Sequence, residues 1–136
     1  MTSFNNMDDV IDSRDIIERI AELRDMRETY LSDFESESER AARTDHWNEC
    51  TPEGEELETL EKLAAECESY ADDWEYGVTL VRDSYFTDYA INLVEECGYI
   101  SKDFPHWIEV DWEATARNVR MDYTNVDFDG VTYWIR

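Results

Sequence analysis

The stretch from Asp45 to Glu75 combines a dense run of acids with a helical repeat of apolar residues. Twelve of its residues are acidic and one, Lys62, is basic. The apolar residues of its second half recur at a 3-4-3-4 spacing: Leu57, Leu60, Ala64, Cys67 and Ala71. Residues spaced in this way share one side of an α-helix. The stretch therefore predicts an amphipathic helix whose wet face is almost wholly carboxylate.

The acids of this helix are spaced like the charges of a nucleic acid strand. At a rise of about 1.5 Å per residue, the seven acids from Glu53 to Glu68 span roughly 23 Å, or about one charge every 3–4 Å. One DNA strand carries a phosphate about every 3.4 Å. We therefore predict a phosphate-mimicking surface that binds a basic partner. Its candidate contacts are Glu53, Glu55, Glu56, Glu58, Glu61, Glu66, Glu68, Asp72 and Asp73.

The composition predicts one compact, folded domain with a strongly acidic surface. The chain has 136 residues, of which 42% are hydrophobic and 13% aromatic, so it can bury a core. Its formal net charge of −23 repels nucleic acid and anionic membranes, and the expected partner is a basic protein surface. A solubilising coat, or adaptation to high salt, is the alternative explanation of the charge. Without a signal peptide or a membrane-spanning run, the expected location is the cytoplasm.

The residues that usually carry catalysis or bind metals form no recognisable motif. The cysteines are three in number and far apart, which fits a reducing compartment. Cys67 falls on the apolar stripe, and Cys97 is a second candidate for the core. His46 and Cys50 have i, i+4 spacing, but no second pair completes a zinc site. The glycines are isolated, so there is no phosphate-binding loop. We expect no enzyme activity, metal or cofactor; a hydrolase built on paired carboxylates such as Glu55 and Glu58 is the minor alternative.

The predicted fold class is α+β and mostly helical, with an N-terminal antiparallel helical hairpin followed by a small helical module that ends in a β-hairpin. Residues 1–11 form a polar lead-in, and Asp12 and Ser13 cap the first helix. That helix either continues to about Ala42 or breaks near Ser36. Residues 44–54 are the expected connection, because they contain a proline and a glycine. The acidic helix, from about Glu53 to Tyr70, completes the hairpin.

The C-terminal part is predicted to alternate short helices and strands. Residues 78–81 have strand composition, a helix over residues 85–94 stops at Gly98, and Asp111 caps a further helix. Asp129 and Gly130 indicate a two-residue hairpin turn, with Val131, Tyr133 and Ile135 on one face of the last strand. Residues 1–76 (24 acids, 7 bases, net −17) form the acidic hairpin, and residues 77–136 (11 acids, 5 bases, net −6) form the aromatic-rich module of one compact unit.

Residues 83–120 resemble the C-terminal region of the ArdA antirestriction family. The resemblance lies in DSYFTDYAINLVEECG, a loop with Pro105, and IEVDWEATARNV. Asp111, Trp112, Glu113 and Ala114 fit the family's Asp-aromatic-acid-Ala run, and residues 116–118 stand where Gly-Arg-Asp is expected. The chain also looks like small acidic phage proteins that are labelled antirestriction. The resemblance implies a homodimeric DNA mimic that occupies the DNA groove of a restriction–modification enzyme, and it carries over no catalytic residue.

Two functions of different classes are therefore open. The first is a phage-type inhibitor that mimics DNA and binds the basic nucleic-acid groove of a host defence protein, either a restriction–modification enzyme or a CRISPR effector. The second is a structural or adaptor protein that binds partners through the apolar stripe, as a coiled coil does, while the acids only keep it soluble. The first predicts binding that salt and duplex DNA disrupt, and the second predicts binding that ignores both.

Overall fold

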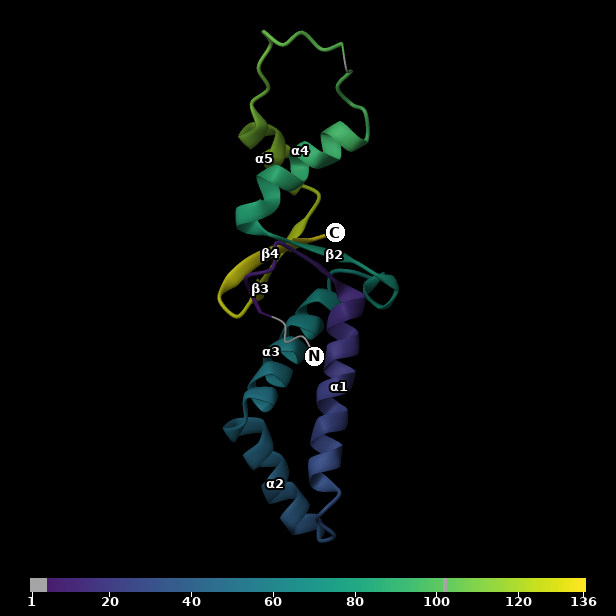
Figure 1. Ribbon diagram of the computed structural model, residues 1–136, viewed down its shortest axis with the longest axis vertical. Helices are drawn as coiled ribbons and strands as arrows, with labels where there is room; N and C mark the ends of the chain where they lie inside the picture. The colour runs from purple at the N-terminus through teal and green to yellow at the C-terminus, as the bar shows by residue number, and fades with distance from the viewer. Residues whose placement is uncertain (1–4, 102) are drawn as a thin grey trace.

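The protein is an α+β, mostly helical molecule, as predicted. The computed structural model describes residues 5–101 and 103–136, and Figure 1 shows a small sheet between a long group of three helices and a shorter pair. In chain order the elements are β1 (Val10–Asp12), α1 (Ser13–Leu31), α2 (Glu37–Cys50), α3 (Pro52–Glu68), the 3-10 turn η1 (Trp74–Tyr76), β2 (Thr79–Arg82), the 3-10 turn η2 (Asp83–Tyr85), α4 (Phe86–Glu96), α5 (Trp112–Arg120), β3 (Thr124–Phe128) and β4 (Val131–Ile135).

The sheet is antiparallel, with strand order β1-β2-β4-β3. The terminal hairpin is confirmed: Val126 pairs with Tyr133, and Asp129 and Gly130 connect the strands with φ angles of 49° and 87°. Positive φ at both central residues is the geometry of the tight turn whose twist matches that of the strands. The strand predicted over residues 78–81 is confirmed within one residue as β2.

The polar lead-in predicted for residues 1–11 is wrong at its end, where Val10–Asp12 form the edge strand β1; residues 1–4 lie outside the described part. Ile11 is 3% exposed and pairs with Leu80. The segment before it is also held, because the Asn6 carbonyl accepts a hydrogen bond from Arg82 and the Asp8 carbonyl accepts one from the Tyr133 hydroxyl. A strand of three residues is too short to show an alternating pattern, so its partner strand decides its conformation.

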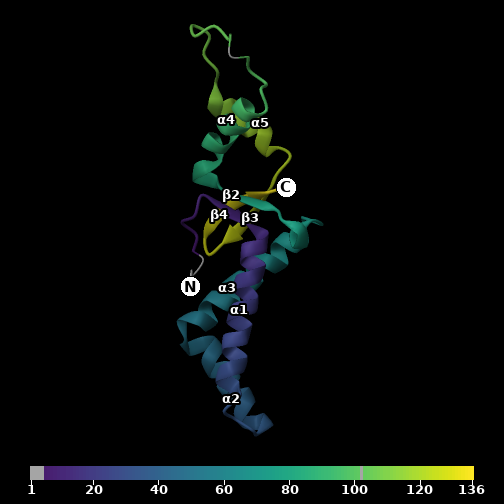
Figure 2. The same ribbon diagram turned by 45° about the vertical axis from the view of Figure 1, so that its right-hand side comes forward.

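The two faces of the sheet cover two separate cores, and Figures 1 and 2 show α1–α3 on one side and α4 and α5 on the other. Successive side chains of a strand point to opposite faces. Leu80, Tyr133 and Ile135 accordingly pack with the long helices, whereas Val81 packs with Phe86 and the α4–α5 pair. The predicted face for Val131, Tyr133 and Ile135 is confirmed. Because the sheet and the larger core take residues from both 1–76 and 77–136, the charge boundary near residue 76 does not separate two cores.

The helical hairpin is confirmed, but its returning arm consists of two helices. The predicted connection over residues 44–54 is wrong: α2 runs to Cys50, and only Thr51 separates it from α3. The break between the first two helices falls between Leu31 and Glu37. Proline is tolerated at the first position of a helix, so Pro52 starts α3 instead of lengthening a loop. Trp47, 6% exposed, anchors α2 in the core.

The junction of α2 and α3 requires a glycine. A Cβ atom at Gly54 would lie 2.2 Å from the Trp47 carbonyl oxygen and 2.6 Å from that of Asn48. Thr51 caps the new helix by accepting a hydrogen bond from the Gly54 amide at 3.0 Å. Gly54, which the sequence suggested was a loop residue, therefore allows the chain to change direction between α2 and α3 over a single residue. No helix in the described part of the chain is both long enough and apolar enough to cross a membrane.

Candidate functional site

The acidic helix α3 is fixed in the molecule by the apolar stripe that the sequence indicates. All five stripe residues are at most 8% exposed: Leu57, Leu60, Ala64, Cys67 and Ala71. They pack in the larger core with α1 and the sheet. Cys67 is a core residue with no exposed surface, and this burial raises the pKa of its thiol to about 12, with smaller contributions from Glu66 and Glu68. Cys97, the second candidate for the core, is exposed at the end of α4.

Glu56, one of the nine predicted contacts, is instead part of the packing between α1 and α3. Its carboxylate accepts hydrogen bonds from both the Nε and Nη2 atoms of Arg19, at 2.7 and 2.8 Å. The Arg19 and Glu56 side chains are only 7% and 14% exposed. Hydrogen bonding to Glu56, and to a lesser extent to Glu22, raises the pKa of Arg19. This corrects the prediction that all seven acids of the helix face the solvent.

Two further acids of α3 make weaker contacts inside the molecule. Glu61 lies 3.5 Å from Arg24 in a pair whose side chains are 41% and 56% exposed. Glu66 accepts a hydrogen bond of 3.2 Å from the backbone amide of Asp127 in β3. An exposed ion pair such as that of Glu61 and Arg24 contributes little to stability, and the backbone amide that Glu66 binds carries no net charge. Both acids therefore keep part of their charge available to a partner.

The other six predicted contacts face solvent and have no basic partner in the described part of the chain: Glu53, Glu55, Glu58, Glu68, Asp72 and Asp73. Glu53 is half-buried in the first turn of α3, and the rest are exposed. Glu55 and Glu58 lie on the same outer side of α3 as Lys62. Asp72 and Asp73 lie beyond the last helical residue, Glu68, in the turn that leads to η1. The structure therefore divides the predicted row into an outer face of α3 and a separate group at its C-terminal end.

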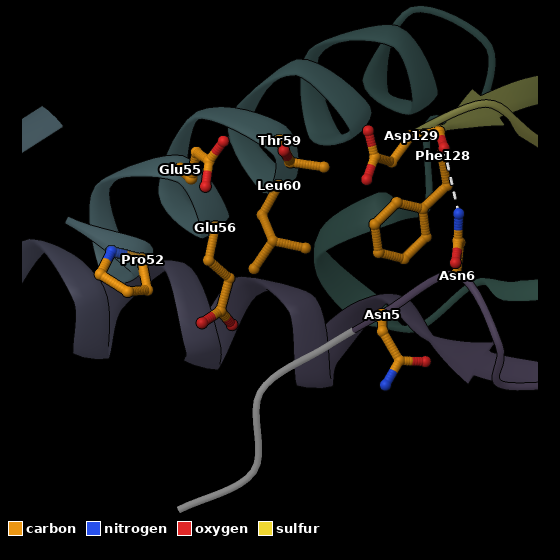
Figure 3. Close-up of a pocket in the computed structure, with 9 residues that line it drawn as sticks. All are labelled: Asn5, Asn6, Pro52, Glu55, Glu56, Thr59, Leu60, Phe128 and Asp129. Carbon is orange, nitrogen blue, oxygen red and sulfur yellow. Dashed lines mark hydrogen bonds between the residues drawn. The ribbon is translucent and has the colours of Figure 1, made fainter. Parts of the chain in front are cut away.

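The β3–β4 turn adds acids to the outer face of α3. A hollow of about 280 Å³ lies between the N-terminal half of α3 and this turn. Figure 3 shows Leu60 and Phe128 facing each other in it, Glu55 and Asp129 at its edge, and Glu56 turned toward α1. The turn is held by a hydrogen bond of 3.0 Å from the Asn6 side chain to the Asp129 carbonyl.

A second hollow of about 190 Å³ continues this surface, and Asp129 lines both. Glu58 and Asp127 line the second hollow, with Lys62 as the one basic residue there. We call the exposed carboxylates of Glu55, Glu58, Asp127 and Asp129 the α3–turn acids. The sequence did not indicate Asp127 and Asp129 as site residues, because in the sequence they predict only a hairpin. Their signal as site residues is the tertiary contact between β3 and α3, which a linear pattern does not contain.

Folding leaves most of the negative charge of this protein unpaired. The chain has 35 acidic residues, and all lie in the described part. Within that part, the acids that form ion pairs are Asp12, Glu22, Glu28, Glu56, Glu61 and Asp83. Residues 5–101 and 103–136 bring no three His, Cys, Asp or Glu side chains together as a metal site. The acids thus form an extended negative surface with no metal site among these residues.

Comparisons with protein-family models, with curated proteins and with solved structures find no match to this chain.

Proposed function

We propose that this protein is an inhibitor that mimics DNA and occupies the basic nucleic-acid groove of a bacterial defence protein, either a restriction–modification enzyme or a CRISPR effector. The observation that carries the proposal is the set of unpaired carboxylates that a rigid helix and a tight turn hold in fixed positions. Glu55 and Glu58 project from α3, whose opposite side is buried, and Asp127 and Asp129 flank them from the hairpin. In this proposal the protein acts in the bacterial cytoplasm, and the partial resemblance to the ArdA family suggests a phage origin.

The proposed mechanism is electrostatic and needs no catalytic group. A negative field of this size steers a basic surface into contact at a high rate, and salt weakens that steering. The carboxylates stand in for phosphates, and the target's Lys and Arg side chains pair with them as they do with DNA. Because Glu56 already binds Arg19, the contacts come from the exposed acids of α3, from Asp72 and Asp73, and from the two acids of the turn.

Burial of the apolar stripe supports this proposal over the adaptor alternative. An adaptor that works like a coiled coil needs an apolar seam on its surface. The stripe of α3 is covered within the same chain by α1 and the sheet. A partner could reach it only by separating α3 from the core.

The first experiment is capture of the target. The purified protein is immobilised and exposed to a bacterial lysate at low salt, and bound proteins are eluted in parallel with a salt gradient and with excess duplex DNA. We expect a DNA-binding defence protein that both eluents release, because DNA competes for the same groove. A partner that stays bound in both eluents contradicts the proposal.

A charge-reversal variant then tests the surface itself. We expect E55K/E58K/E68K/D127K to lose inhibition of the captured enzyme, because the surface would then repel a basic groove. The matched control D88K/E96K/E113K/D122K makes the same change in net charge at exposed positions around α4 and α5. Circular dichroism checks that both variants are folded. Equal inhibition by the two folded variants would show that only the total charge counts, and the proposed surface would be wrong.

A further inference from the structure

The connection between α4 and α5 carries an unusual concentration of exposed apolar side chains. Residues 97–111 have no helix or strand among the described positions, and Figure 1 shows this loop at the far end of the molecule from α2. Tyr99 and Trp107 are 76% and 74% exposed, and Phe104 and Ile108 are 38% and 39% exposed. Long loops without regular structure are uncommon in compact domains and are usually functional. Exposed apolar side chains that cluster in this way mark an interaction site.

Two of these side chains, Phe104 and Ile108, line a groove of about 690 Å³, which we call the α4–α5 groove. Its apolar lining consists of Ile100, Phe104, Ile108, Val110 and Trp112. The volume falls within the range of roughly 300–1,000 Å³ that is common for ligand sites. The loop shapes the groove through local hydrogen bonds, such as that from the Ile108 amide to the Pro105 carbonyl at 3.1 Å.

The groove also has an acidic edge. Glu95 and Glu109 line it together with the apolar residues. Residues 95–113 contain six acids and one basic residue, a net charge of −5, whereas residues 77–136 as a whole carry −6. The negative charge of the C-terminal part is thus concentrated around its most apolar surface. This charge repels nucleic acid, anionic lipid and a second copy of the same loop.

We propose that the α4–α5 groove binds an amphipathic segment of a partner protein, with apolar side chains that enter the groove and Lys or Arg residues that pair with its acidic edge. Burial of the apolar side chains supplies the affinity, and the carboxylates favour segments that carry Lys or Arg beside those side chains. Helical segments with one apolar face bind hydrophobic grooves of other proteins in this manner. The site uses none of the α3–turn acids, so it does not depend on the proposed DNA mimicry.

A synthetic peptide with the chemistry expected of the partner segment tests the site directly. The probe is a peptide of about 18 residues made of Leu and Lys, with its leucines on one side of a helix. Two further peptides serve as controls: a scrambled sequence of the same composition, and the same pattern with Glu in place of Lys. Titration calorimetry on the full chain is expected to show saturable one-to-one binding of the patterned Leu/Lys peptide. Equally tight binding of the scrambled peptide would indicate attraction to the acidic surface alone and would overturn the proposal.

Two variants with matched controls locate the binding. We expect I108D to weaken binding of the patterned peptide at least about tenfold, as loss of a central apolar contact does. M121D introduces the same charge at an apolar residue that is 81% exposed and lies outside the groove, and it should leave the affinity within about twofold. E95Q/E109Q should weaken binding and reduce its dependence on salt, whereas D88N/D122N should do neither. Equal affinities for I108D and M121D would place the peptide elsewhere.

A second copy of this chain is the other candidate occupant of the groove, and the oligomeric state distinguishes it from a partner segment. We expect light scattering to give the same molar mass for the wild-type chain and for I108D, both at low salt and at high salt. A dimer that I108D alone abolishes would show that a second copy fills the groove, and it would overturn the assignment to a basic partner segment.

Discussion

Replacing Arg19 with methionine tests whether its ion pair with Glu56 stabilises the folded protein. The guanidinium makes two hydrogen bonds to the Glu56 carboxylate, at 2.7 and 2.8 Å, and a third to Glu22 at 3.1 Å. Methionine keeps most of the volume but supplies no donor. The variant therefore places an apolar side chain next to the Glu56 carboxylate, which is 14% exposed, and removes the two hydrogen bonds and the positive charge that Arg19 supplies to it.

The expected loss of stability follows from that burial. Removing one partner of a buried ion pair costs about 3–5 kcal/mol, because the other charge remains desolvated. Glu56 keeps some contact with water, so we expect the lower end of this range for R19M. For a urea m-value of about 2 kcal/mol/M, such a loss lowers the unfolding midpoint by about 1.5 M. The double variant R19M/E56L removes both charges and should recover at least about 1.5 kcal/mol of the summed losses.

Urea unfolding followed by circular dichroism measures R19M, E56L and R19M/E56L, and Arg24 provides the control. Arg24 lies 3.5 Å from Glu61, and their side chains are 56% and 41% exposed, so R24M should cost only about 0.5 kcal/mol. A loss for R19M that does not exceed the loss for R24M would refute the reasoning. Glu56 would then return to the set of acids that a partner can contact.

Three further outcomes follow from the charge and from the buried groups. Raising NaCl from low to about 0.5 M should increase the melting temperature, since salt screens the repulsion between unpaired carboxylates; an unchanged or lower value contradicts this. Burial, as the largest cause, raises the pKa values of Cys67, Tyr123 and Tyr133 to about 12 from 9.0 and 10.0. As the pH rises, these groups ionise in the unfolded chain before they ionise in the folded one, so the free energy of unfolding should fall between pH 9 and 12. Urea titrations at alkaline pH measure this fall, and a free energy that does not change with pH would contradict the prediction. At pH 8 an alkylating reagent should modify the exposed Cys50 and Cys97 in the native protein but not Cys67, and a third adduct in the mass spectrum would contradict its burial.

Elements with a strong local signal could be predicted from the sequence. The spacing of Leu57, Leu60 and Cys67 predicts the buried side of α3, and all three are buried. Gly98 ends α4 as expected: it has a φ of 68°, and its amide and that of Tyr99 close the last turn. The Asp111 side chain caps α5 through the Ala114 amide. In each case the residue itself sets the local conformation.

The errors concern features that tertiary contacts decide. Pro52 and Gly54 suggest a loop, yet Trp47 and the close approach at Gly54 make their segment a junction between helices. Val10 and Ile11 form a strand only because β2 lies beside them. For the candidate site, a helical pattern predicts the outer face of α3, but it cannot predict that Glu56 meets Arg19 of another helix. It also gives no sign that the hairpin turn comes next to that face.

The central sheet separates two unlike surfaces of one molecule. Its two faces separate the core of α1–α3 from that of α4 and α5, so the α3–turn acids and the α4–α5 groove lie on different sides of the sheet. A target that contacts both surfaces would be held bivalently, and loss of one contact would leave it tethered at a high local concentration near the other. If the two surfaces bind separate proteins, the same geometry makes the chain a bridge between them.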